Sequence, residues 1–197
     1  MSRVVGIVGS YRKGGMTDAA VEAVLAGARE KGAQTQTIYL TERPIEFCTN
    51  CRQCTQTKGP DRGTCVQEDG LAPLLAEIDA ADAIVLGSPV NCWNVTAIFR
   101  RFMERLLGYT YWPWGQAAPK LRKKSISRKA ILLATSAMPG FLIPLATGAA
   151  RALHGTAQML GARPVGKLWI GLASNQQHQE LSARNRERAR RLGWKLA

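Results

Sequence analysis

Four of the five cysteines in the chain gather in one short stretch, and thiols at such spacing can bind metal or carry electrons. Cys48, Cys51 and Cys54 are separated from one another by two residues, and Cys65 follows further along. Steps this short turn a chain around a small cuboidal [4Fe-4S] cluster, with the last thiol closing the set. Four thiols also suit a tetrahedral zinc ion, or remain free and able to form disulfides. The spacing leaves these three interpretations open.

The same clustering bears on the compartment of the cell. Met1 and its neighbours run directly into a strand-like segment, without the pattern of a secretion signal. Clustered cysteines in a chain without such a signal favour metal binding or redox chemistry over a disulfide framework. Cys92 stands apart and is expected to be an ordinary buried thiol or part of a pocket wall. We therefore predict a cytoplasmic protein.

A glycine-rich loop over residues 9–17 has the composition of an anion site. It precedes a helical pattern, and the amides at a helix start attract anions. Ser10 and Thr17 add hydroxyl groups, and Arg12 and Lys13 add positive charge. The loop matches neither the dinucleotide-binding motif nor the P-loop motif, so a monophosphate ester fits best. A plain strand-to-helix turn is the alternative.

Two later loops have the composition of a binding site for a flat ring. Residues 88–96 combine a proline with an aromatic ring and two amides, which suits a heteroaromatic group with polar edges. Trp93 as a simple core residue is the alternative there. Residues 135–141 begin with small side chains, which let a ring edge approach the backbone.

These three loops connect elements of an α/β fold. Apolar strand-like runs alternate with helical patterns, as in a parallel sheet covered on both faces. Strands are predicted at 3–8, 35–40, 83–86, 130–134 and 165–170, and helices at 17–31, 71–79, 95–107, 145–160 and from about 180. We expect a flavodoxin-like three-layer sandwich with strand order 2-1-3-4-5, whose ligand lies at the carboxyl ends of the strands.

The chain is expected to form one domain over residues 1–197, with a cysteine-containing insertion at about 44–70 and a basic helix at about 180–197. The longest apolar stretch, 130–138, is too short to cross a membrane. An aromatic arm at 109–115 could roof the pocket or cover a partner subunit. Exposed aromatic groups on this scale predict a homodimer or homotetramer.

The net charge of +13 comes from 27 basic and 14 acidic residues. Segments 120–129 and 181–197 concentrate the excess. Such blocks can bind nucleic acid or an acidic protein, or they can form a solvated face that partly serves the phosphates of NADPH. Because the sequence shows no nucleic-acid-binding module, we favour the solvated face.

Three motifs in chain order resemble the NADPH-dependent FMN reductase and iron–sulfur flavoprotein family. They are Gly9-Ser10-x-Arg12-x-Gly14-Gly15-x-Thr17, Ser88-Pro89-Val90 and Phe102-Met103-Glu104-Arg105, placed around the cysteines. The resemblance implies that Ser10, Arg12, Met16 and Thr17 hold the phosphate of FMN. It also implies that 89–94 flank the isoalloxazine ring and that 136–140 close its other side. Asn91 stands where the family commonly has tyrosine, which leaves Trp93 to stack on the ring.

The expected cofactor-binding residues come from all three loops: Ser10, Arg12, Lys13, Gly15, Met16, Thr17, Pro89, Val90, Asn91, Cys92, Trp93, Asn94, Ser136, Ala137 and Gly140. The expected metal ligands are Cys48, Cys51, Cys54 and Cys65. The resemblance implies an FMN-dependent NAD(P)H oxidoreductase that passes electrons to a quinone-like, flavin or protein acceptor, with or without the cluster. A non-enzymatic electron carrier and a flavin-free nucleic-acid-binding regulator are the alternatives. No side chain is predicted to act as an acid or base.

Overall fold

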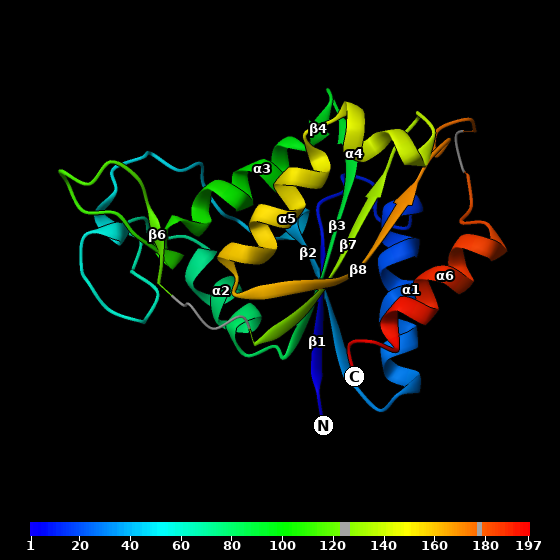
Figure 1. The fold of residues 1–197 in the computed structure, drawn as a ribbon, viewed down its shortest axis with the longest axis horizontal. Coiled ribbons are helices and arrows are strands. Elements are labelled where there is room, and N and C mark those ends of the chain that lie inside the picture. The colour runs from blue at the N-terminus through cyan, green and yellow to red at the C-terminus, as the bar shows by residue number, and fades with distance from the viewer. Residues whose placement is uncertain (123–126, 177–178) are drawn as a thin grey trace.

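Strands rich in branched apolar residues alternate with amphipathic helices, and together they build a parallel sheet with helices on both faces (Figure 1). The computed structural model describes residues 1–122, 127–176 and 179–197, so part of the basic segment 120–129 lies outside the described residues. The strands are β1 (Arg3–Val8), β2 (Gln34–Tyr39), β3 (Ala83–Asn91), β4 (Asn94–Val95), β5 (Thr110–Tyr111), β6 (Lys120–Leu121), β7 (Arg128–Thr135) and β8 (Ala162–Ile170). The helices are α1 (Met16–Glu30), α2 (Leu71–Asp79), α3 (Ala97–Glu104), α4 (Ile143–Ala146), α5 (Ala149–Met159) and α6 (Ala183–Gly193).

The five long strands are parallel and lie in the order β2-β1-β3-β7-β8. This confirms the predicted order 2-1-3-4-5. In the centre of the sheet, Val4 pairs with Ala83 and Ala83 pairs with Lys129. Because all five strands run the same way, their carboxyl ends meet at one edge of the sheet.

Side chains of each strand alternate between two buried layers, as the pleat requires. On β1, Val5 and Ile7 join one apolar cluster, while Val4 and Val8 join the other. Helices α2, α3 and α5 cover the first cluster, and α1 and α6 cover the second (Figure 1). Burial on both faces explains why the strands are almost continuous apolar runs in the sequence.

The third strand is longer than the sequence predicted. We expected it over 83–86, but β3 continues to Asn91 and turns back into β4. Cys92 and Trp93 form the turn, with φ of 46° and 64°. Two successive positive φ values are typical of a type I′ hairpin, whose turn usually contains Asn or Gly. Cys-Trp is not such a pair, so the residue types did not predict this hairpin.

The predicted helix over 145–160 is two helices, α4 and α5, with Thr147 in extended conformation between them. The Thr147 hydroxyl donates to the carbonyl of Ile143 and accepts from the first amide of α5, so it ends one helix and begins the other. The Gly148 amide donates to the carbonyl of Trp93 at 2.8 Å. The break is therefore fixed by a contact with the β3–β4 hairpin.

The other predicted elements agree with the structure to within a few residues. The predicted helix over 95–107 is α3, which gives way to a 3-10 turn at Arg105–Tyr109. The short β5–β6 hairpin was not predicted. Among the described helices, none combines the length and apolar character that a bilayer crossing requires.

Helices α1 and α6 cross with their backbones in contact. A Cβ added at Gly193 would lie 2.0 Å from the carbonyl oxygen of Val24. The replacement Gly193→Ala must therefore push α6 away from α1, and we expect it to lower the free energy of unfolding by about 1–3 kcal/mol. Urea unfolding followed by circular dichroism measures this loss.

Gly155→Ala in α5 is the matched control, because no described atom lies within 4 Å of the added Cβ. Alanine favours a helix over glycine, so this variant should be as stable as the parent or more stable by about 0.5–1 kcal/mol. Equal stability of the two variants would contradict the close crossing of α1 and α6.

Candidate cofactor site

The loops that follow β1, β3 and β7 lie next to one another, because these strands are neighbours in the sheet. Val8 pairs with Gly87, and Pro89 pairs with Thr135, so the three strands end at nearly the same position along the edge of the sheet. The amide of Gly9 donates to the carbonyl of Gly87 at 2.8 Å, which extends the contact into the first loop. The predicted grouping of the three loops is therefore present at this edge.

The first loop folds tightly over the start of α1. The Ser10 hydroxyl accepts from the amide of Arg12 at 3.1 Å, and the amide of Gly15 donates to the carbonyl of Arg12 at 3.3 Å. Within the described residues, no side chain caps α1 at Gly15. The first amides of α1, at Met16 and Thr17, point out of the helix end, where an anion is favoured.

The two predicted cations of this loop have different surroundings. Lys13 lies 2.5 Å from a carboxylate oxygen of Glu42 and 4.3 Å from the centre of the Tyr39 ring. Arg12 is exposed, and no ion pair involves it in the described part of the chain. Arg12 is therefore the better placed of the two to meet an anion at the start of α1.

A carboxylate already lies beside this loop. Asp18 in the first turn of α1 accepts the amide of Gly14 at 2.6 Å and the Tyr39 hydroxyl at 3.4 Å. Burial and then the charge of Asp18 raise the pKa of Tyr39. Asp18 thus accepts one amide of the loop, and the amides of Met16 and Thr17 at the helix end are the ones left for an anion.

Thr17 and Thr135 link α1 to the end of β7. Both side chains are buried, and their hydroxyl oxygens are 2.8 Å apart. In the third loop, the Ser136 hydroxyl accepts from the amide of Met138 at 3.1 Å, and its amide donates to the carbonyl of Ile170. Thr17 therefore joins α1 to the end of β7, and Ser136 shapes the third loop and joins it to β8.

The β3–β4 hairpin presents its turn to solvent. The Trp93 side chain is 68% exposed, so its interpretation as a core residue is wrong. Cys92 is also exposed, which contradicts a buried thiol and agrees with a place in a pocket wall. Both residues hold positive φ values without being glycine or asparagine, and such conformations are often found at binding sites.

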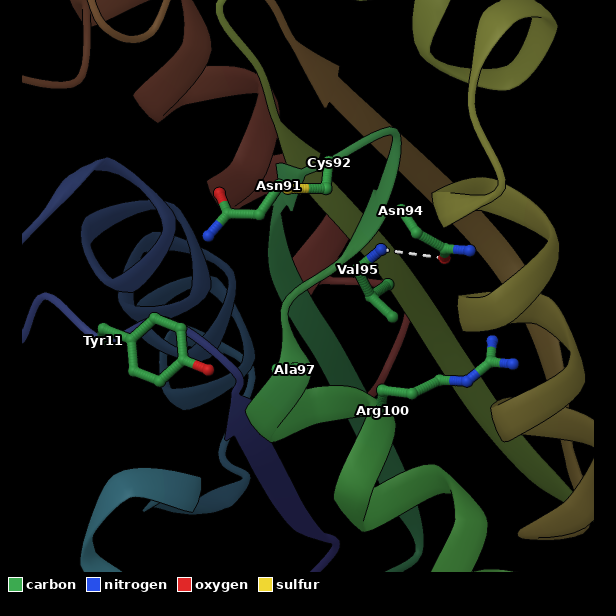
Figure 2. A pocket seen from close by; sticks show the side chains of 7 residues that line it. All are labelled: Tyr11, Asn91, Cys92, Asn94, Val95, Ala97 and Arg100. Atoms are coloured by element: carbon green, nitrogen blue, oxygen red, sulfur yellow. Dashed lines mark hydrogen bonds between the residues drawn. The ribbon is translucent and has the colours of Figure 1, made fainter.

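A hollow of about 380 Å³ lies at the base of this hairpin. Figure 2 shows the side chains around it, with Tyr11 from the loop after β1 and Arg100 from α3. The Tyr11 hydroxyl accepts from the amide of Ile98 at 3.1 Å, so it joins the first loop to the start of α3. The lining residues are Tyr11, Asn91, Cys92, Asn94, Val95, Ala97 and Arg100.

The hollow brings together three of the predicted residues, Asn91, Cys92 and Asn94, and leaves the others outside it. The predicted residues of the loop 9–17 and those of 136–140 lie at the same edge of the sheet but do not line the hollow. Tyr11 and Arg100 were not predicted. Tyr11 could have been predicted, because it is an aromatic residue inside a glycine-rich loop. Nothing in the sequence around Arg100 indicated a place at the site.

The cysteines lie on the irregular segment between β2 and α2. Cys51 is exposed, and Cys48, Cys54 and Cys65 are partly buried. Burial raises the pKa of Cys54, and charge interactions with the other three cysteines raise it further. In the described residues, no three His, Cys, Asp or Glu side chains converge closely enough to hold a single metal ion.

Arginines hold this segment in place. Arg122 donates to the carbonyls of Cys54 and Thr57 on the segment and to that of Gly108 beyond α3. The guanidinium of Arg52 lies 3.7 Å from the centre of one indole ring and 4.2 Å from a second, those of Trp112 and Trp114. The aromatic arm therefore packs against the cysteine segment, in addition to the roles that its sequence predicted.

The hydroxyl pair of Thr17 and Thr135 can be tested without any ligand. Thr17→Val alone leaves the Thr135 hydroxyl buried without its partner, and we expect the FMN-free protein to lose about 1–3 kcal/mol of unfolding free energy. The double variant Thr17→Val/Thr135→Val removes both hydroxyls, and we expect it to regain most of that loss. Urea unfolding of the parent, Thr17→Val, Thr135→Val and the double variant gives the coupling energy; additive losses would contradict a direct hydroxyl pair.

Comparison with known proteins gives one family and one fold. The family described as NADPH-dependent FMN reductase matches residues 2–172 of the chain. An iron-sulfur flavoprotein from Archaeoglobus fulgidus is 33% identical over 111 residues, which cover 56% of this chain and 48% of that protein. An iron-sulfur flavoprotein from Methanosarcina thermophila is 29% identical over 103 residues, which cover 52% of this chain and 51% of that protein. The chain spans about half the length of the curated relatives it matches.

Solved structures share the fold along the whole chain. An NAD(P)H:quinone oxidoreductase from Methanothermobacter marburgensis superposes with a TM-score of 0.70 and 20% identity, over 100% of this chain and 99% of that one. An azoreductase from Bacillus anthracis gives a TM-score of 0.71 with 15% identity, over 99% of this chain and 100% of that one. At such low identity these neighbours establish the flavodoxin-like architecture and nothing further.

Proposed function

Because the chain belongs to the NADPH-dependent FMN reductase family, we propose that it is an FMN-dependent NAD(P)H oxidoreductase. The observation that carries this proposal is the start of α1, which no described side chain caps, together with the preceding loop, which contributes Tyr11 to the hollow at the β3–β4 hairpin. A site for a phosphate and a site for a planar ring then adjoin each other at the carboxyl edge of the sheet, where such folds bind ligands.

The phosphate of FMN would lie at the start of α1. The amides of Met16 and Thr17 supply hydrogen bonds there, and the helix dipole favours the charge. Ser10 and Gly15 shape the loop through their hydrogen bonds to Arg12. Arg12 supplies the cation, because Lys13 is already paired with Glu42.

The ring would lie against the second and third loops. Pro89 and Val90 lead into the hairpin, and the amide side chains of Asn91 and Asn94 offer polar groups at the hollow. The exposed indole of Trp93 is free to cover a ring, as the absence of tyrosine at position 91 suggested. Ser136, Ala137 and Gly140 follow β7 at the same edge of the sheet and would close the other side.

In this arrangement the chain binds FMN, orients its ring and shields it from solvent. When bound, FMN accepts a hydride from NAD(P)H and passes the electrons to an acceptor. The loops after β1, β3 and β7 fix the ring relative to the sheet, and the open hairpin leaves one side accessible to a substrate. A quinone-like compound, a flavin or a protein is the acceptor that we propose.

The four cysteines would hold an iron–sulfur centre, although they form no single-ion site as they stand. The chemistry of the donors fits, because thiolates are the ligands of iron–sulfur clusters and the chain carries four cysteines on this one segment. The sulfurs of Cys48 and Cys65 already accept N–H groups at 3.4 Å, as thiolate ligands of clusters do. Such a centre supplies one-electron transfer, and free cysteines suit the reducing cytoplasm.

A second copy of the chain is proposed to cover the exposed apolar groups near the site. Trp93, Phe141 and Leu145 are more than half exposed, and they lie on loops and helices at the carboxyl edge of the sheet. Exposed apolar groups of this size usually mark an interface. This supports the homodimer or homotetramer that the sequence predicts.

The proposed activity is tested by the colour of the flavin. The protein loaded with FMN under argon should lose the visible absorbance of oxidised flavin when NADPH or NADH is added, and a quinone should restore it. Bleaching only by a separate reductase would indicate an electron carrier instead. A preparation that fails to retain FMN after gel filtration would contradict the proposal altogether.

The phosphate site is tested by a pair of charge variants. Loss of a charge-assisted hydrogen bond corresponds to about 1.5–3 kcal/mol, so Arg12→Gln should weaken FMN binding about 10- to 100-fold. Lys13→Gln is the matched control, because Lys13 is paired with Glu42, and we expect a much smaller loss.

Flavin fluorescence quenching on the FMN-free protein measures both affinities. Riboflavin lacks the phosphate, so its affinity should be the same in Arg12→Gln and in the parent. An equal loss of riboflavin and FMN affinity in Arg12→Gln would place Arg12 away from the phosphate.

A further inference from the structure

The hollow at the base of the β3–β4 hairpin extends beyond the residues that we assign to the flavin. Three of those residues form its hairpin side, and its other walls come from Tyr11, Val95, Ala97 and Arg100. Its volume of about 380 Å³ lies in the range of pockets that bind small molecules. Figure 2 shows Tyr11 and Arg100 on either side of Ala97. The part of the hollow against α3 is therefore left for a second ligand.

The guanidinium of Arg100 can accept an anion on this side of the hollow. Its Nε donates to a carboxylate oxygen of Glu104 at 3.3 Å, and no described residue accepts a hydrogen bond from its two terminal nitrogens. Ala97 lies one turn earlier on the same face of α3, and its small side chain leaves the guanidinium uncovered. A planar fork of this kind binds phosphate through two parallel hydrogen bonds.

Tyr11 gives the same hollow an aromatic surface. Its side chain is more than half exposed, while its hydroxyl accepts from the amide of Ile98 at 3.1 Å, which fixes the ring relative to α3. The amide side chains of Asn91 and Asn94 add polar groups at the hairpin side. An aromatic surface, a few amides and a cation around one hollow suit a nucleotide that carries a phosphate.

The position of Arg100 indicates which phosphate it meets. The proposed reaction needs a second nucleotide besides FMN, the dinucleotide NAD(P)H, and its nicotinamide must reach the flavin ring at the hairpin. Helix α3 leads away from the hairpin, so Arg100 faces a part of the dinucleotide that is remote from the nicotinamide (Figure 1). In NADPH the phosphate furthest along the molecule from the nicotinamide is the 2′-phosphate of the adenosine, which NADH lacks.

We propose that Arg100 is a specificity-determining residue, which selects NADPH over NADH by binding the 2′-phosphate in the hollow between Tyr11 and α3. The inference rests on the proposed NAD(P)H oxidoreductase activity and specifies its electron donor. Glu104 acts in the opposite direction, because it competes for the guanidinium and its negative charge repels a phosphate. Both side chains are about half exposed, so the effect of Glu104 is the smaller one.

The experiment compares variants of the full chain loaded with FMN and uses two ratios. The first is kcat/KM for NADPH over that for NADH, with a quinone as the acceptor. The second is the affinity for adenosine 2′,5′-bisphosphate over that for adenosine 5′-monophosphate, measured by isothermal titration calorimetry. Neither of these two adenosine compounds can reduce a flavin, so the second ratio does not depend on turnover.

Arg100→Gln should lower both ratios about 10- to 100-fold, because a charge-assisted hydrogen bond to the 2′-phosphate is lost. Arg100→Lys should lower them by less, because the positive charge remains while the planar fork does not. Glu104→Gln should raise both ratios about 2- to 5-fold, because the guanidinium is then released from its exposed ion pair.

Arg184→Gln is the matched control. It also removes one exposed positive charge, but Arg184 belongs to α6, which covers the opposite face of the sheet from α3. Both ratios should equal those of the parent, which separates a local contact from the general effect of the net charge. Opposite shifts in Arg100→Gln and Glu104→Gln are not expected from structural damage, because both side chains lie at the surface.

Several results would overturn the inference. Unchanged ratios in Arg100→Gln would show that Arg100 does not bind the 2′-phosphate. Equal losses of affinity for the bisphosphate and the monophosphate would place Arg100 elsewhere on the nucleotide and would refute the assignment as well. A loaded parent whose flavin is bleached by neither NADPH nor NADH would refute the proposed activity, whereas the calorimetric ratio would still report separately on Arg100.

Discussion

The parallel register of β1, β3 and β7 is the constraint on which the rest of the structure depends. Val8 opposite Gly87, and Pro89 opposite Thr135, bring three separate loops to one edge of the sheet. Two apolar clusters keep that register, because a strand that slipped by one residue would exchange its buried faces. The candidate site is thus built from loops whose relative positions are determined by the core beneath them.

Helix α3 connects this edge to the cysteine segment. At its start, the side chain of Thr96 and the hydroxyl of Tyr11 satisfy two of the first amides, and Ala97 lines the hollow. At its end, Arg105 meets Asp69 and Cys65. Buried side chains on the face between, such as Phe99, hold the helix on the sheet. One rigid element therefore relates the position of the hollow to that of the thiols.

The sequence predicted the features that depend on local residue patterns and on the alternation of strands and helices. The strand order and the three loops followed from apolar runs that end in small or polar residues, such as Gly9 after Val8. The hairpin at Cys92 and Trp93 could not be predicted in this way. Its positive φ values are imposed by the pairing of β3 with β4 and by the contact with the start of α5, rather than by residue type. Arg52 could not be assigned either, because its partners lie about sixty residues away.

The cysteine segment illustrates how a stretch with few core contacts is held. Its backbone carbonyls would be left without partners in an irregular loop, and Arg122 supplies donors to several of them at once. A planar guanidinium can do this and also stack on an aromatic ring, as Arg52 does, whereas a lysine ammonium cannot. Hydrogen bonds from arginine side chains to its backbone and stacking on the aromatic arm therefore stabilise this segment, and these contacts determine where its cysteines lie.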